Sequence, residues 1–198
     1  MYSAGYLARK VWIDYVIVWV RWGASVKIPL DYICVKSGIL CPRCQALVDS
    51  GEVDSREVDI MRALIELEES GNQLLKKAVY HKAYFIDSQM IVIVMDLGVG
   101  SSVPVYTKYA RNIEKGLANK LGVKVKLIPH TSDLRSLALH LLYPARVLGV
   151  NTLWLPNGSV EYVVRVSRRD RRFLEKNREF FEKILTELSG KKVQIRYE

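Results

Sequence analysis

A repeated order of predicted elements is the feature that most constrains the fold of this chain. Apolar periodicity predicts a helix, two strands, a loop, a helix and a strand over residues 55–128, and the same order over residues 131–197. Each repeat has about 70 residues, enough for helices packed on one face of a three-stranded sheet. The sequence therefore predicts an α+β protein with two related modules. A single α+β domain whose elements happen to alternate is the alternative.

The first repeat is defined by apolar runs and their spacing. We predict a helix over residues 55–77, strands over 80–86 and 90–95, a glycine-bearing loop over 96–105, a helix over 108–121 and a strand over 123–128. A turn at residues 87–89 makes the two strands a hairpin.

The second repeat follows the same pattern with stronger turn signals. We predict a helix over 131–143, strands over 150–155 and 160–166, a basic loop over 167–172, a helix over 174–188 and a strand over 192–197. The turn at 156–159 contains Asn-Gly, which is typical of a β-hairpin.

Positive charge is concentrated in the second half of the chain. Residues 101–198 carry 19 basic and nine acidic side chains, whereas residues 27–100 carry eight and 11. A positive excess over a whole domain favours a polyanionic partner, because neutralised phosphates release counterions. A solvated basic surface rich in ion pairs is the alternative.

The three cysteines lie close together and predict a metal site. Cys41 and Cys44 have the spacing of a zinc knuckle, and Cys34 precedes them. Asp31 stands three residues before Cys34, which completes a paired pattern of four ligands for structural Zn²⁺. His81 and His130 are alternative fourth ligands, and reduced thiols without metal are the competing interpretation.

Residues 1–26 form an N-terminal extension. The apolar run at 11–20 is flanked by basic residues, as in a signal peptide, but Asp14 interrupts it and it is too short to span a bilayer. We interpret the segment as an extension from a misassigned start codon and predict a cytoplasmic protein without a membrane partner.

The order of the elements resembles the type II K-homology fold of RNA-binding modules. Two such modules in tandem, with Pro144-Ala145-Arg146 and Leu148-Gly149-Val150-Asn151, resemble the archaeal proteins related to the transcription elongation and termination factor NusA. The segment from Ile28 to Gln45 resembles a zinc-binding segment ahead of such modules, in which a cysteine takes the place of Asp31. The resemblance covers residues 27–198 and implies a zinc knuckle at 27–50 and modules at 51–129 and 130–198, each α-β-β-α-α-β. It leaves the extension at 1–26 unexplained.

Neither module has the Gly-x-x-Gly clamp that a K-homology module uses to hold phosphates. Gly98-Val99-Gly100 has a different spacing, and the second loop has four arginines and no glycine. We therefore predict that side chains bind RNA, by charge and by stacking. The predicted residues are Tyr106, Lys108, Tyr109, Arg111 and Lys115 in the first module and Arg168, Arg169, Arg171 and Arg172 in the second. Half-buried packing is the alternative for the two tyrosines, and a solvated loop with Glu175 and Glu179 as local partners is the alternative for the arginines.

The sequence contains no recognisable catalytic constellation. It has no nucleophile elbow and no Walker loop, and its three histidines are scattered. We expect a protein that binds single-stranded RNA, has no enzymatic activity and no small-molecule substrate, and acts with transcription or RNA-processing machinery. The rival hypothesis is a protein-interaction adaptor whose degenerate modules dock on RNA polymerase, the ribosome or an RNA-processing assembly.

Overall fold

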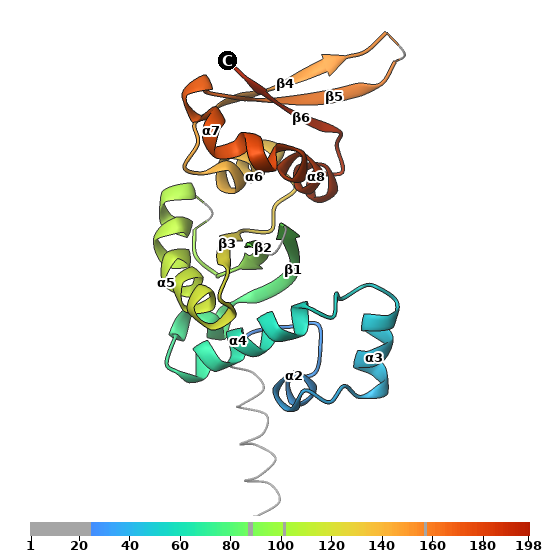
Figure 1. The fold of residues 1–198 in the computed structure, drawn as a ribbon, viewed down its shortest axis with the longest axis vertical. Coiled ribbons are helices and arrows are strands. Elements are labelled where there is room, and N and C mark those ends of the chain that lie inside the picture. Colours follow the sequence, from blue (N-terminus) through green and yellow to red (C-terminus); the bar gives the residue numbers. More distant parts are fainter. Residues whose placement is uncertain (1–24, 87–88, 101, 157) are drawn as a thin grey trace, which may run out of the picture. The chain divides into compact units, whose positions relative to one another are not determined.

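The structure, a computed structural model, describes residues 25–86, 89–100, 102–156 and 158–198 (Figure 1). The chain divides into two compact units, one up to Val79 and one over Tyr80–Glu198. That division does not coincide with the module boundaries predicted at residues 50 and 129. The apolar run at 11–20 and the turn residues 87–88 lie outside the described residues.

The first unit is helical. It contains α2 (Tyr32–Ser37), α3 (Pro42–Asp49), α4 (Glu57–Glu69) and the 3₁₀ helix η1 (Gln73–Lys77). Side-chain hydrogen bonds fasten α2 to α4, because Arg62 Nε donates to the carbonyl of Val35 at 3.0 Å and the Tyr32 hydroxyl donates to Glu69 at 2.6 Å. The short cysteine-bearing segment is thereby anchored on a longer helix.

The predicted helix over residues 55–77 is wrong beyond Glu69. Gly71 has a φ of 105°, a conformation that ends an α-helix and that glycine adopts without strain. The side chain of Asn72 then accepts a hydrogen bond from the N–H of Leu74 and caps η1. Two separate helices therefore replace the single predicted one.

The first sheet of the second unit has the order β1-β2-β3. Its strands are β1 (Val79–Ile86), β2 (Met90–Asp96) and β3 (Lys124–Ile128), and α5 (Val103–Leu121) connects β2 to β3. The β2 and β3 strands are parallel, with Met90 opposite Lys124 and Val94 opposite Ile128. The central strand β2 is buried from Ile91 to Met95, so the predicted strand is confirmed as a core element.

A single helix, α5, connects β2 to β3, so the predicted pair of helices is wrong for this repeat. Pro104 lies in the first turn of α5, where the missing N–H of proline costs no hydrogen bond. The helix therefore begins at Val103, within the segment predicted to be a loop. It ends where Gly122 adopts a φ of 70°.

The second sheet has the order β4-β5-β6, with β4 and β5 antiparallel and β5 and β6 parallel. It follows α6 (Leu134–Leu142), and its strands are β4 (Val147–Trp154), β5 (Val160–Val166) and β6 (Val193–Tyr197). Between β5 and β6 lie η2 (Arg168–Asp170), α7 (Arg171–Leu174), η3 (Glu175–Asn177) and α8 (Arg178–Ser189). The helices α6 and α8 lie on one face of this sheet (Figure 1).

The predicted basic loop over residues 167–172 is helical after Ser167. The 3₁₀ turn η2 is followed directly by α7, so the arginines project from two short helical segments. The predicted helix over 174–188 is interrupted by η3 and becomes continuous only in α8.

Both sheets share one hydrophobic core within the second unit. Fully buried side chains from β2, α6, β5 and α8 pack in it, among them Val92, Leu137, Val164 and Ile184. The protein is therefore a mixed α+β structure with two three-stranded sheets. Among the described residues, no helix is both long and apolar enough to cross a membrane.

Truncating a side chain in this core should destabilise the fold. Leu137 is 0% exposed, so we expect Leu137→Ala to lower the free energy of unfolding by about 2–5 kcal/mol, through lost burial and a residual cavity. Leu148→Ala is the matched control, because Leu148 is 51% exposed and its change should stay within about 0.5 kcal/mol. Chemical denaturation followed by circular dichroism measures both, and equal effects would contradict the assignment of the core.

Candidate metal centre and basic surfaces

The four predicted metal ligands come together in the first unit. Their ligand atoms all lie within 4.8 Å of one another. Asp31 precedes α2, Cys34 lies in α2, Cys41 precedes α3, and Cys44 lies in the first turn of α3. The two short helices therefore position the four side chains, because Asp31 and Cys41 each lie directly before a helix and Cys34 and Cys44 lie within it.

The distances in this cluster fit a tetrahedral zinc site. The Sγ atoms of Cys41 and Cys44 lie 3.5 and 3.6 Å from Asp31 Oδ2. Bond lengths of about 2.3 Å to sulfur and 2.1 Å to oxygen in a tetrahedron place such ligand atoms about 3.6 Å apart. The group can therefore hold a metal ion with little rearrangement.

Backbone amides surround the sulfur atoms of the cluster. The N–H of Cys41 donates to Cys34 Sγ, and the N–H of Asp31 donates to Cys44 Sγ, each at 3.3 Å. Such bonds stabilise a thiolate and orient it toward a metal. The backbone N–H of Cys44 lowers the pKa of the Cys41 thiol, whereas burial raises the pKa of the Cys44 thiol to about 12. Metal binding therefore has to release the proton from Cys44.

The residues predicted to bind RNA in the first repeat differ in exposure. Lys108, Tyr109, Arg111 and Lys115 are exposed on α5. Tyr106 is only 2% exposed, and its hydroxyl donates to the carbonyl of Met95 at 2.6 Å. Burial also raises the pKa of Tyr106. The prediction that Tyr106 stacks on a base is therefore wrong, because its ring belongs to the packed face of α5.

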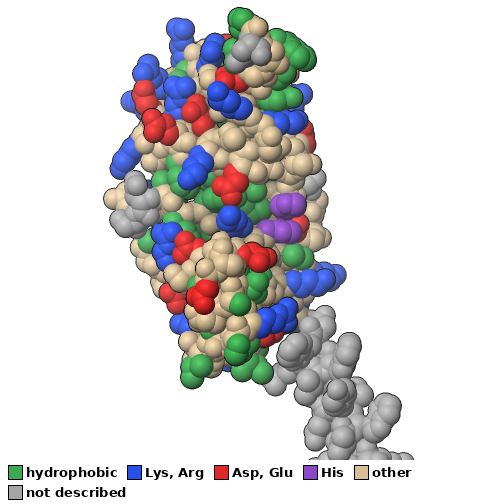
Figure 2. Space-filling view, turned by 90° about the vertical axis from the view of Figure 1, so that its right-hand side faces the viewer, with side chains coloured by type: hydrophobic (Ala, Val, Ile, Leu, Met, Phe, Trp, Pro, Cys, Tyr) green, Lys and Arg blue, Asp and Glu red, His purple; other side chains and the backbone are tan. Residues whose placement is uncertain are grey.

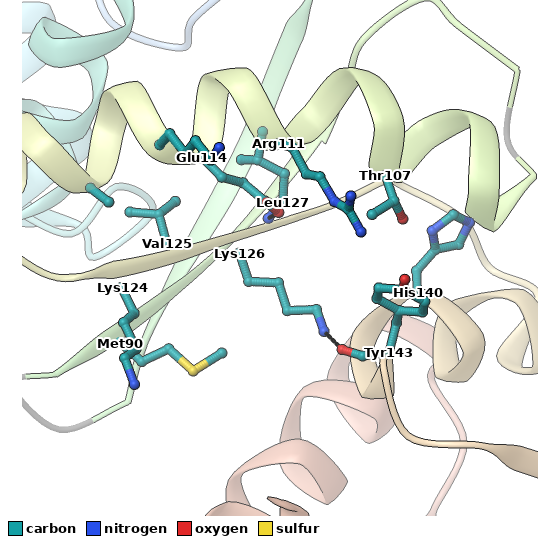
Figure 3. Close-up of a pocket in the computed structure, with 12 residues that line it drawn as sticks. Met90, Thr107, Arg111, Glu114, Lys124, Val125, Lys126, Leu127, His140 and Tyr143 are labelled. Atoms are coloured by element: carbon teal, nitrogen blue, oxygen red, sulfur yellow. Dashed lines mark hydrogen bonds between the residues drawn. The ribbon is translucent and has the colours of Figure 1, made fainter.

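A basic pocket of about 520 Å³ lies between α5, β3 and α6 (Figure 3). Its cationic lining residues are Arg111, Lys115, Lys124 and Lys126. The ammonium group of Lys126 points across the pocket and donates to the carbonyl of Tyr143 (Figure 3). Burial lowers the pKa of Lys126 to about 8, although the nearby Glu114 carboxylate raises it. The pocket thus holds a cation that is incompletely hydrated.

Glu114 also lines this pocket. Its Oε1 accepts a hydrogen bond from the N–H of Leu127 at 2.9 Å, and burial raises its pKa. Lys124 and Lys126 alternate with apolar residues in the strand predicted over 123–128, which indicates a cationic face but no pocket. Their place in a pocket depends on the pairing of β3 with β2 and on the position of α6.

The four predicted arginines of the second repeat are exposed at one end of the second sheet. The turn that carries them is fastened by backbone bonds, because the N–H of Arg168 donates to the carbonyl of Glu198 and the N–H of Ser167 donates to the carbonyl of Arg146. Arg171 pairs with Glu175 at 2.5 Å. Among the described ion pairs, none involves Arg168, Arg169 or Arg172. These three cations are available for an anionic partner.

Further cationic and aromatic side chains, not predicted from the sequence, join these arginines. Arg178 and Arg196 line a groove with Arg168, Arg171 and Tyr197. The guanidinium carbons of Arg171 and Arg178 lie 5.8 and 5.9 Å from the centre of the Tyr197 ring. Cations at such distances are attracted by an aromatic face. The alternation of charged and apolar residues in β6 was the signal for Arg196, but nothing local indicated that α8 brings Arg178 to it.

Phe173 is the most conspicuous residue that sequence reasoning missed. It follows Arg171 and Arg172 directly and is 68% exposed. A large apolar ring in a segment that is otherwise strongly basic is not explained by core packing. The sequence could have indicated it, because Phe173 lies between the predicted arginines and the helix predicted from residue 174.

No protein-family model and no curated protein matches the sequence. The chain is similar to APE1850, whose crystal structure it matches with a TM-score of 0.44 and 18% sequence identity. The matched region covers 67% of this chain and 95% of that chain.

Changing Asp31 should change metal affinity at the cysteine cluster. We expect Asp31→Ala to weaken metal binding by more than about tenfold, because one of four ligands is lost, and Asp31→Cys to strengthen it. Asp49→Ala is the control, because Asp49 is exposed on α3 and bonds to Gln45 instead. Absorption from thiolate-to-metal charge transfer during a Co²⁺ titration measures the affinity. Absence of this absorption in reduced wild-type protein would show that the cluster binds no metal.

Proposed function

We propose that the protein binds single-stranded RNA through basic side chains, and that it is related to the transcription elongation and termination factor NusA. The observation that carries the proposal is the arginine surface, defined as Arg168, Arg169, Arg171, Arg172, Arg178 and Arg196 together with the exposed ring of Phe173. Planar guanidinium groups donate two hydrogen bonds together to a phosphate. An exposed aromatic ring among them provides a face on which an unpaired base stacks.

The repeated architecture supports two K-homology-like modules at residues 51–129 and 130–198. Helix, strand, strand, helix and strand occur in that order from α4 to β3 and again from α6 to β6. In each sheet the last two strands in sequence are parallel, and the second strand lies in the middle and pairs with both of the others. The second repeat, with α7 and α8 between β5 and β6, follows the order expected of a type II K-homology module, whereas the first repeat has the single helix α5 in that place.

The arginine surface substitutes for the missing glycine clamp. A clamp binds phosphates through backbone N–H groups, whereas here the backbone of the turn is already bonded to Glu198 and Arg146. Recognition therefore falls to side chains, and Arg168, Arg169 and Arg172 carry the largest share because their charge is not offset by an ion pair among the described residues. Lys and Arg side chains are frequent on the part of the surface formed by the second sheet and its helices (Figure 2).

The basic pocket of the first repeat provides a second phosphate site in this proposal. Arg111 and Lys126 extend into it from α5 and β3 (Figure 3). An anion there would replace water around the Lys126 ammonium group and favour its charged form. Lys108 Nζ lies 6.0 Å from the centre of the Tyr109 ring. These two exposed side chains would extend the binding surface from the pocket along α5.

The remaining features fit a binding protein rather than an enzyme. In this proposal the metal centre is structural, because its four protein ligands would leave Zn²⁺ no open position for a substrate. The protein would act in the cytoplasm, in transcription or RNA processing, without a small-molecule substrate.

A protein-interaction adaptor is the second candidate function, favoured by one observation. The β4–β5 hairpin exposes Trp154 by 73% and Leu148 by 51%. Exposed tryptophan is typical of residues that anchor protein partners. In this alternative the hairpin docks on RNA polymerase, the ribosome or an RNA-processing assembly, and the arginines only keep the surface basic.

Neutralising two arginines should reduce both affinity for RNA and its dependence on salt. We expect Arg168→Gln with Arg169→Gln to lower the slope of log K against log salt by up to about 1.4, at about 0.7 per phosphate contact. Fluorescence anisotropy with single-stranded RNA over a salt series measures the slope.

Lys76→Gln with Lys77→Gln is the matched control, since these two exposed cations lie in η1 of the first unit. It should leave the slope within error of the wild type. An equal loss in both double variants would mean that net charge alone attracts RNA, and the adaptor would then be the better explanation.

Removing the exposed ring should weaken binding without changing the salt slope. We expect Phe173→Ala to cost about 1–3 kcal/mol of binding free energy, the usual value of one stacked base. Trp154→Ala is the control, because Trp154 is at least as exposed but lies at the far end of β4 from the arginine turn. If Trp154→Ala weakened RNA binding more than Phe173→Ala, the RNA would lie on the hairpin and the proposed surface would be wrong.

A further inference from the structure

Three ligand-type side chains meet at one end of the first sheet. His81 lies near the start of β1, Asp96 ends β2, and His130 follows β3 after Pro129. Their ligand atoms all lie within 4.8 Å of one another. We call these three residues the histidine cluster. It belongs to the second unit, and neither the cysteine cluster nor the arginine surface shares a residue with it.

The strand pairing explains why residues so distant in sequence meet. Because β2 and β3 are parallel, the residues that follow them emerge at the same end of the sheet. His81 reaches this end from the neighbouring strand β1, where its Nε2 lies 3.0 Å from Asp96 Oδ2. The sheet thus places His81 and Asp96, and the end of β3 brings His130 to the same end of the sheet.

Asp96 is held by the backbone as well as by His81. Its Oδ1 accepts a hydrogen bond from the N–H of His130 at 3.0 Å, which leaves Oδ2 directed at the imidazole of His81. A carboxylate fixed in this way by a backbone donor is the usual support of a metal ligand. The bond also ties the His130 backbone to the same carboxylate.

The two imidazole rings lie against each other at the surface. Their centres are 4.3 Å apart and their planes are inclined by 17°. Figure 2 shows histidine side chains adjacent to one another and open to solvent. Each ring carries a nitrogen that can serve as a metal ligand. Neutral imidazole is the form that binds metals.

From these observations we infer that His81, Asp96 and His130 bind a divalent transition metal ion. Two imidazoles and one carboxylate suit Zn²⁺, Ni²⁺ or Co²⁺ better than Mg²⁺ or Ca²⁺, which prefer oxygen ligands. Ligand atoms about 2.1 Å from a metal lie about 3.0 Å apart at an octahedral angle and about 3.4 Å apart at a tetrahedral one. The separation of His81 Nε2 and Asp96 Oδ2 is 3.0 Å. A nitrogen of the exposed His130 ring lies within 4.8 Å of a ligand atom of each of these two residues.

The histidine cluster differs in kind from the cysteine cluster. Three protein ligands at an exposed position leave coordination sites for water or for an anionic group such as a phosphate. The cysteine cluster supplies four ligands and no open position. A metal at the histidine cluster would therefore be exchangeable and more weakly held, and protons would compete with it as the pH falls.

Nuclear magnetic resonance of the full-length protein tests the inference with a built-in control. Addition of Zn²⁺ should shift or broaden the imidazole signals of His81 and His130. The signals of His140 should not move, because His140 is only 4% exposed and packs edge-to-face against Tyr106. Equal changes at all three histidines, or none, would overturn the assignment.

A Co²⁺ titration of variants tests it independently. We expect the wild-type protein to bind about two equivalents, and His81→Ala with His130→Ala to bind about one. The Co²⁺ equivalent that the variant loses should lack thiolate-to-metal charge-transfer absorption. This absence distinguishes loss of metal at the histidine cluster from loss of metal at the cysteine cluster. Asp96→Asn, which keeps the shape of the side chain, should weaken the same binding by about tenfold or more. Unchanged stoichiometry and affinity in both variants would show that the cluster is only an ion pair beside a stacked ring.

Discussion

The parallel pairing of β2 with β3 and of β5 with β6 is the constraint on which the second unit depends. Parallel strands cannot be joined by a tight turn and need a crossover connection of a dozen or more residues. The helix α5 makes this connection in the first sheet, and the segment from η2 to α8 makes it in the second. The second connection supplies buried residues of the common core, among them Leu174, Phe181 and Ile184, whereas the buried residues of α5 lie outside that cluster.

The same pairing places both candidate sites of the second unit at equivalent edges. In the first sheet Asp96 and His130 follow the ends of β2 and β3. In the second sheet the arginine turn follows β5, and Arg196, opposite Arg165, lies at the end of β6. The two edges differ in chemistry. At the second sheet the arginine turn covers the edge and is bonded to Glu198, whereas at the first sheet two histidine rings occupy an exposed edge.

Features that depend on residues close in sequence could be predicted, whereas sites that depend on the pairing of distant strands could not. Spacing pointed to the four residues of the cysteine cluster, with His81 and His130 as alternatives to Asp31, since the four lie within 14 residues and two short helices. His81 and His130 are almost 50 residues apart, so only the sheet brings them together. The burial of Tyr106 was predictable, because Tyr106, Ala110, Ile113 and Leu117 follow helical spacing and form one buried stripe on α5. The glycine-bearing loop predicted over 96–105 concealed it, because the helix in fact begins at Val103.

The absence of a glycine clamp has a consequence for how each sheet can hold an anion. A continuous α5 leaves no bend between two helices where backbone N–H groups would be exposed, so in the proposed RNA-binding function cations would take their place. Lys126 is suited to this role because burial lowers its pKa to about 8, which is still above neutral pH. It is therefore mostly charged but poorly hydrated, and an anion that enters the pocket supplies the interaction that water does not. Since anion binding and protonation favour each other, an anion bound in this pocket would raise the pKa of Lys126, and its affinity would fall as the pH rises above 8.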